Sequence, residues 1–266
     1  MRLHEINPGE KRKLQKSKFE SVWDKLIVPN CSEILSMYKL SNSLLYRGLK
    51  HDFGLIFRGS SRTNRRPLDS YLTLSELFEV GLKSIGMTAL RSNSIFASNK
   101  PSIAGAFGDY VYIIFPIDGF EYTWFSDADI TLGNQYPFLK GWANSDIIDT
   151  ITQAWESEEY LRDYYAPNFM RDPSVVDLTK NLSSNINNIN KLLGRHNIPP
   201  IQPIDLIDVE KFKIYYNPQK TGLLDMMKNS KYSPKETMIT GSYYAFDNCY
   251  EKQITDKLFE NKVSLN

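Results

Sequence analysis

The chain of 266 residues is poor in the side chains that build metal sites and disulfide frameworks. It contains two cysteines, Cys31 and Cys249, and three histidines. Two cysteines so far apart give neither the paired spacing of a zinc site nor the framework of a small disulfide-rich domain. We therefore expect no metal and a reducing compartment, the cytoplasm.

Long apolar runs and a phosphate-binding loop are also missing. No apolar stretch approaches the roughly 20 residues that a membrane-spanning helix needs. The basic N-terminal segment does not lead into the apolar core of a signal peptide. A GxxxxGK[ST] motif is absent. These absences predict a soluble protein with no membrane partner, and they argue against a P-loop nucleotidase.

The chain carries no excess of charge of one sign. Its 32 Lys and Arg residues are balanced by 31 Asp and Glu residues, which leaves a formal charge of +1. Proteins that coat nucleic acid non-specifically depend on a strong positive excess. The composition argues against that class of protein, although it leaves room for local basic patches.

Apolar residues are plentiful enough, at 41% of the chain, to fill a sizeable core. Spacings of three and four predict helices over 9–28, 32–40, 74–85, 101–107, 175–193 and 222–229, with Pro29 and Gly194 as ends. Alternating or continuous apolar runs predict strands over 43–49, 92–98, 109–116, 120–124, 209–216 and 236–246. We expect an α+β fold in which N-terminal helices (1–42) precede one domain (43–266) with a helical insertion at about 145–200.

Three places in this pattern are candidates for chemistry. In the strand containing Tyr46, Arg47 and Gly48, a charge lies between apolar residues and beside a glycine that permits close approach of a ligand. Around Ser98, small and hydroxyl residues join a strand to a helix whose N-terminus favours phosphate. Glu236 opens an apolar strand. Each alone also has a simpler explanation: a paired surface arginine, a capped junction and a solvated carboxylate.

Taken in order, the three places resemble the mono-ADP-ribosyltransferase fold. A strand with YRG, a later strand of the form hydrophobic-Phe-x-Ser, a strand ending in Phe-Pro and a late strand opened by Glu are similar to the R-S-E class of bacterial toxins. The similarity is closer to bacteriophage-encoded ADP-ribosyltransferase-like proteins, in the segments 62–71, 89–98, 112–130 and 235–246. It implies a split, mixed or antiparallel sheet with flanking helices.

The resemblance also implies roles for individual residues. Arg47 matches the arginine that positions NAD, the substrate, through its phosphates and ribose, and the backbone of Gly48 is expected to hold the nicotinamide carboxamide. Ser98 matches the serine that supports the arginine and the catalytic glutamate, which Glu236 matches. We add Tyr46 as a ring that can stack on NAD, and Arg62 and Arg65, with Arg58 and Arg66 of the same Arg-rich loop, as cations that can reach its pyrophosphate or an anionic acceptor.

Two positions depart from the family pattern. The serine motif reads Ser98-Asn99-Lys100, so only its first serine is retained, and Ile95 with Arg47 argues against polymer synthesis. Pro234 stands two residues before Glu236, where arginine-modifying members carry Glu or Gln. The second departure argues against arginine as the acceptor.

These expectations leave three functional hypotheses. The first is transfer of ADP-ribose from NAD to a host macromolecule during phage infection, with a protein as the expected acceptor and nucleic acid as an alternative. The second is NAD glycohydrolase activity on the same site. The third is an inactive member of the fold that binds and inhibits a host factor. The expected location is the cytoplasm of the bacterial host, reached by expression there or by delivery with the phage particle.

Overall fold

A computed structural model describes residues 17–63, 72–125, 181–195, 199–216, 222–228 and 236–259. The chain divides into two compact units, which are described separately. Unit 1 comprises 1–61, 96–122 and 221–266, and unit 2 comprises 62–95 and 123–220. Helices and an antiparallel-paired sheet are both present, so the α+β prediction is confirmed at that level.

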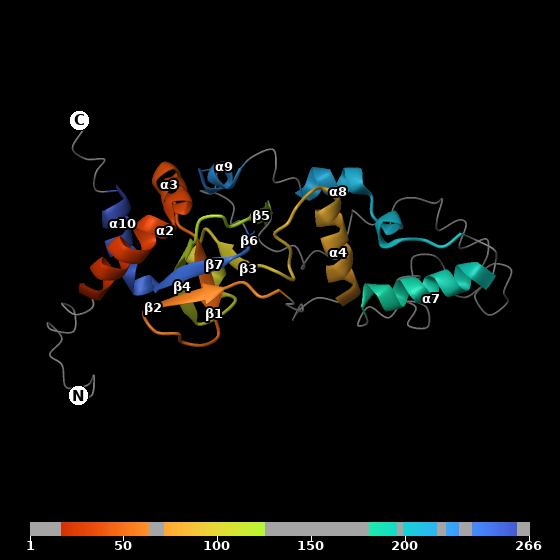
Figure 1. Cartoon of the computed structure of the whole chain (residues 1–266), viewed down its shortest axis with the longest axis horizontal. Coiled ribbons are helices and arrows are strands. Elements are labelled where there is room, and N and C mark those ends of the chain that lie inside the picture. Colours follow the sequence, from red (N-terminus) through yellow and green to blue (C-terminus); the bar gives the residue numbers. More distant parts are fainter. Residues whose placement is uncertain are drawn as a thin grey trace. The chain divides into compact units, whose positions relative to one another are not determined.

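The strands form one seven-stranded sheet in the order β2-β7-β4-β1-β3-β6-β5. Figure 1 labels each of these strands. Pairing is antiparallel between β1 and β3, β1 and β4, β2 and β7, and β4 and β7. The strands are β1 (Tyr46–Leu49), β2 (Ile56–Ser60), β3 (Ile95–Ser98), β4 (Tyr110–Pro116), β5 (Tyr122–Phe125), β6 (Glu236–Ile239) and β7 (Ser242–Asp247). The chain passes from one unit to the other within β3 and within β5.

This sheet cannot be flat between β7 and β6. Three strands separate them in the strand order, which in a flat sheet would place them four strand spacings, about 19 Å, apart. Only Thr240 and Gly241 connect them, so the Cα atoms of Ile239 and Ser242 lie within about 11 Å of each other. The sheet therefore folds back on itself, and the sharp turn uses the positive φ of Gly241, 87°.

One face of the sheet in unit 1, here called the helix face, carries an aromatic cluster. Phe115 of β4 packs edge-on against Trp23, Tyr38 and Phe246, with ring centroids 5.4 to 5.6 Å apart. Phe19 stacks on Trp23 and on Tyr250. All six rings are buried. Edge-to-face and offset pairs of this kind add to the stability that their burial already contributes.

The helices of unit 1 supply the outer rings of this cluster. Residues 17–22 are helical and continue into the π-helix η2 (Trp23–Ile27) and α2 (Val28–Asn30). The prediction that Pro29 ends the helix is therefore wrong, because Pro29 lies inside α2. The helix α3 (Ser32–Ser41) follows as predicted and ends at Asn42, whose φ is 53°. The helix α3 lies next to β4 and contacts α10 (Glu251–Phe259) (Figure 1). The helix α9 (Leu223–Lys228) packs on α3, and η8 (Asn248–Tyr250) leads into α10.

A carboxylate far away in the sequence caps α3. The Asp118 carboxylate accepts hydrogen bonds from the Ser32 N–H (3.0 Å), the Ser32 hydroxyl (2.6 Å) and the Glu33 N–H (2.9 Å). Desolvation opposes ionisation of Asp118, but these three bonds outweigh it and lower the pKa below its ordinary value. The loop after β4 is thereby fixed to the start of α3.

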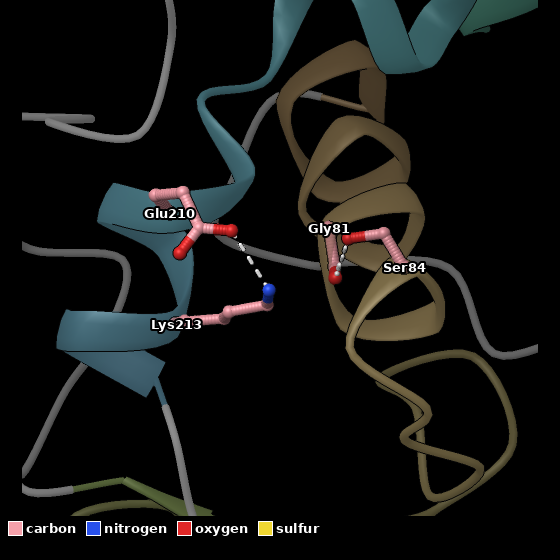
Figure 2. Close-up of polar contacts among 4 residues, drawn as sticks. All are labelled: Gly81, Ser84, Glu210 and Lys213. Carbon is pink, nitrogen blue, oxygen red and sulfur yellow. Dashed lines mark hydrogen bonds and ion pairs between the residues drawn. The ribbon is translucent and has the colours of Figure 1, made fainter.

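Apart from the parts of β3 and β5 that belong to it, unit 2 is built of helices and their connections in the residues described. It contains α4 (Leu72–Ser84), α7 (Leu182–Arg195), η6 (Pro203–Leu206) and α8 (Val209–Tyr216). Gly81 of α4 leaves room for the Phe212 ring of α8, because a Cβ at position 81 would lie 2.3 Å from that ring. Figure 2 shows the polar contacts staying within each helix: the Ser84 hydroxyl donates to the Gly81 carbonyl, and Lys213 pairs with Glu210.

The start of α7 is fixed by two side chains. Glu76 of α4 accepts from the Leu182 N–H, and Asn181 accepts from the Ser184 N–H. Further along the helix, Asn190 bonds both the N–H and the carbonyl of Ile201, at 2.7 and 3.0 Å. The segment that leads into η6 is thus tied to α7.

Several sequence-based predictions of elements were wrong. The segment 209–216, predicted as a strand, is the helix α8, because Phe212 packs against α4. Part of the predicted Arg-rich loop is the strand β2, which pairs with β7. The single strand expected over 236–246 is two strands, β6 and β7, and Gly194 lies inside α7. The part of the predicted insertion at 126–180 lies outside the described residues.

Candidate functional site

Three neighbouring strands carry the three residues selected from the sequence. Arg47 lies on β1, Ser98 ends β3 and Glu236 begins β6, and these strands are adjacent in the order β1-β3-β6. All three residues belong to unit 1. Segments far apart along the chain are therefore brought together in one part of the sheet, which is the candidate functional site.

Arg47 points to the face opposite the helix face, here called the Arg47 face. It is half-buried and lies directly across from Tyr112 on β4, and opposed residues of antiparallel strands share a face. Its guanidinium carbon lies 5.7 Å from the centroid of the Tyr243 ring on β7. A cation over an aromatic face within about 6 Å is a favourable contact. The guanidinium thus reaches across β4 to a second strand.

The backbone of Gly48 faces the place where β1 and β3 separate. The Ile114 N–H donates to the Leu45 carbonyl (3.0 Å), so the backbone groups of Leu45 point to β4. Backbone groups alternate in direction along a strand, so those of Gly48 point to the β3 side. Among the described residues, Tyr46 and Ser98 form the pair that joins β1 to β3. The Gly48 N–H and carbonyl are therefore directed beyond that pair, where backbone can bond a ligand.

The missing side chain of Gly48 has a packing reason as well. A Cβ built at this position would lie 1.9 Å from the Ala104 carbonyl oxygen of α5 (Pro101–Gly105). A Cβ at Gly108 would likewise lie 2.3 Å from the backbone of Leu49. The close approach predicted at Gly48 is thus made by a helix of the protein itself, on the side away from Arg47. The helix α5, predicted from Pro101, is confirmed.

Ser98 and Tyr46 face away from the Arg47 face. They are directly opposed, so both lie on the helix-face side of the sheet. The Ser98 hydroxyl accepts from the Lys100 N–H (3.3 Å) at the turn into α5. The Tyr46 hydroxyl donates to Glu251 of α10 (2.9 Å), and burial together with that carboxylate raises the tyrosine pKa. Tyr46 is 5% exposed and has a packing role here, which leaves it poorly placed to stack on a ligand at Arg47.

Glu236 is buried, with 7% of its surface exposed. Taken alone, a glutamate at the start of a strand is expected to be solvated, and the structure corrects that expectation. Ionisable side chains are rarely buried to this extent without a structural or functional reason, because desolvation disfavours the charge. A buried carboxylate on a strand beside β3 is the feature of the site that ordinary surface patterning does not explain.

The structure describes two of the four arginines of the Arg-rich loop, Arg58 and Arg62. Arg58 is exposed on β2 and lies across from Tyr244, on the helix-face side. Arg62 is exposed and is the first residue of unit 2. Arg65 and Arg66 lie outside the described residues. The contacts to pyrophosphate that we expected of Arg62 and Arg65 therefore remain predictions.

Aromatic rings surround Arg47, which was not expected from the sequence. Tyr112 accepts from the Phe53 N–H (3.0 Å) and donates to Asp52 (3.1 Å), and its burial is the main cause of a raised pKa. Asp52 also accepts from the Gly54 N–H (2.7 Å), so the loop between β1 and β2 is fixed beside Arg47. Alternation within β4 and β7 was the available signal, but it becomes readable only once the register is known.

Neither a metal cluster nor a membrane span is found in the described part of the chain. No group of three or more His, Cys, Asp or Glu residues there is placed to hold a metal ion. No described helix is both long enough and apolar enough to cross a bilayer. Comparison of the chain with protein-family models, with curated proteins and with solved structures finds no match.

Proposed function

We propose that the protein transfers ADP-ribose from NAD to a host macromolecule, with a protein as the acceptor class, at the site where β1, β3 and β6 lie side by side. The observation that carries the proposal is the buried carboxylate of Glu236 at the start of a strand close in the sheet order to the one that holds Arg47. A carboxyl group and a guanidinium in one part of a sheet suit a substrate that has both an anionic pyrophosphate and a cationic leaving group.

The residues present fit NAD in kind. The half-buried guanidinium of Arg47 offers a fork of donors to phosphate oxygens. The N–H and carbonyl of Gly48, directed to where β1 and β3 separate, match the two halves of a carboxamide, one acceptor and one donor. The Ser98 hydroxyl accepts a hydrogen bond at the turn into α5, and its role in this proposal is to hold the backbone at the end of β3.

In the proposed reaction, the bond between C1′ of the ribose and the nicotinamide nitrogen breaks, and its electron pair leaves with nicotinamide. Positive charge develops on the ribose, and the carboxylate of Glu236 stabilises that charge more in the transition state than in the ground state. A lone pair of the acceptor then forms the new bond to C1′, and the acceptor's proton passes to solvent. Water as the acceptor gives free ADP-ribose, which is the glycohydrolase outcome.

The test uses the full chain, labelled NAD and a bacterial lysate, with bound label and free nicotinamide followed together. The comparison is between the wild type, Glu236→Gln and Glu210→Gln, a matched control at an exposed position of α8. Bound label that falls about 100- to 1000-fold in Glu236→Gln alone supports the proposal, because losses of that size follow removal of a preorganised electrostatic group. Nicotinamide without bound label supports glycohydrolysis, and neither product from the wild type refutes catalysis and favours a binding protein.

A further inference from the structure

Two residues of β2, Gly59 and Phe57, surround the Tyr243 ring of β7. On β2, Gly59 lies directly across from it, and a Cβ there would be 2.5 Å from the ring carbon Cζ and 2.6 Å from the hydroxyl oxygen. Phe57 packs against the ring edge-on, with centroids 6.1 Å apart. The ring is 5% exposed. Its position is therefore set by β2 and by packing, independently of β1.

Arg47 meets this fixed ring with its charged end. The guanidinium carbon is 5.7 Å from the ring centroid, although β4 separates β1 from β7. An arginine side chain has many rotamers, and ordering it on binding a ligand costs free energy. A ring that already holds the guanidinium lowers that cost.

We propose that Tyr243 is a positioning residue for Arg47: its ring, seated by Gly59, holds the guanidinium where it binds a pyrophosphate. The consequence for NAD rests on the proposed function, whereas the contact itself does not. Tyr243 acts through Arg47 and does not need to touch the substrate. Gly59 is needed for the same contact, since a side chain at position 59 displaces the Tyr243 ring.

The first measurement is the NAD dissociation constant, by calorimetry on the full chain, with kcat and KM for nicotinamide release. Tyr243→Leu raises the dissociation constant about three- to tenfold, which corresponds to about 0.7 to 1.4 kcal/mol, while kcat at saturation changes less. Tyr243→Phe, which keeps the ring, restores the affinity to within about twofold of wild type. Gly59→Ala weakens binding in the same direction as Tyr243→Leu. Equal affinities in Tyr243→Leu and wild type overturn the proposal.

The second measurement separates this inference from the proposed function. Melting temperatures of Arg47→Met, Tyr243→Leu and the double variant form a cycle that reports the contact without NAD. The losses should fail to add by about 1 to 4 °C. Additive losses overturn the proposal whatever the NAD result. If the wild type binds no NAD but the cycle shows coupling, the proposed function fails and the positioning of Arg47 by Tyr243 stands.

Discussion

On the helix face of unit 1, Phe115 and Phe246 pack against four further aromatic rings, whereas the residues alternating with them on the same strands face Arg47. Tyr112 and Tyr243 are among those alternating residues, and each contacts a polar or charged group. One strand pair therefore supplies a dry, apolar layer and a layer that holds charge. Alternation within β4 and β7 thus separates apolar packing on one face from polar and charged contacts on the other.

The largest expected effect is on the helix face. Phe246→Ala removes a buried ring and leaves a cavity, so we expect a loss of about 3 to 5 kcal/mol in unfolding free energy, measured by denaturant titration. Phe53→Ala is the control, because Phe53 is 55% exposed and its loss should stay below about 0.5 kcal/mol. Similar losses in the two variants would break the division between the faces.

The next effect is on the Arg47 face and should appear in binding. Arg47→Lys keeps the charge but loses the guanidinium fork, so NAD affinity should fall by about 1.5 to 3 kcal/mol. The melting temperature should change little, since lysine keeps a cation near the Tyr243 ring and position 47 lies outside the aromatic cluster. Arg58→Lys, on an exposed position of β2, is the matched control and should bind as the wild type does. Unfolding of Arg47→Lys without a binding defect would contradict the comparison.

A third variant sharpens the comparison on β1, the strand that carries Arg47, at the side of the sheet away from Arg47. Gly48→Ala places a Cβ against the Ala104 carbonyl, which is backbone and cannot move without α5, so we expect a loss of about 1 to 3 kcal/mol. Gly105→Ala is the control, because its nearest neighbour is Val111 at 3.8 Å and alanine favours helix. Circular dichroism melts distinguish them; a Gly48→Ala protein as stable as the wild type would show that α5 is free to shift.

The smallest effect concerns the cap of α3. Asp118→Ala should cost about 1 kcal/mol at neutral pH, as loss of a capping side chain does. The pKa of Asp118 is lowered from 3.8 in the folded state, so the contribution is fully present above that pH and is lost as the pH falls through the lower folded value. Melting curves of the two proteins should therefore differ at pH 7 and converge in acid. A constant difference at all pH values would assign the effect to packing.

Local patterns predicted the elements that carry a clear apolar period or a helix-start signal. The helix α3 and the strand β4 follow from apolar spacing, and α5 follows from Pro101 at its start. The apolar residues of 209–216 fit the period of a strand in part and the period of a helix in part. Packing of Phe212 on Gly81 favours the helix. The strand β2 was missed because its short sequence, IFRGS, lies in a polar, Arg-rich stretch and forms a strand through pairing with β7, which is far away in the chain.

The candidate site also combines features that local sequence predicts with features that it does not. Arg47 and Glu236 were selected from local context, and the structure places them on strands close in the sheet order. The burial of Glu236 could not be inferred from a strand start, and the roles of Tyr243, Gly59 and Asp118 depend on contacts between distant segments. Tyr46 was selected for its ring, but strand alternation turns it to the opposite face. Register, which local sequence does not contain, decides each of these cases.

The two-residue connection at Thr240 and Gly241 has a consequence for synthesis on the ribosome. The strands that it joins, β6 and β7, flank the central strands β4, β1 and β3, so both edges of that centre stay open until the last part of the chain has emerged. Open strand edges pair readily with other chains. A nascent chain that stalls before Glu236 would present two such edges at once, and β2 would have no strand to join.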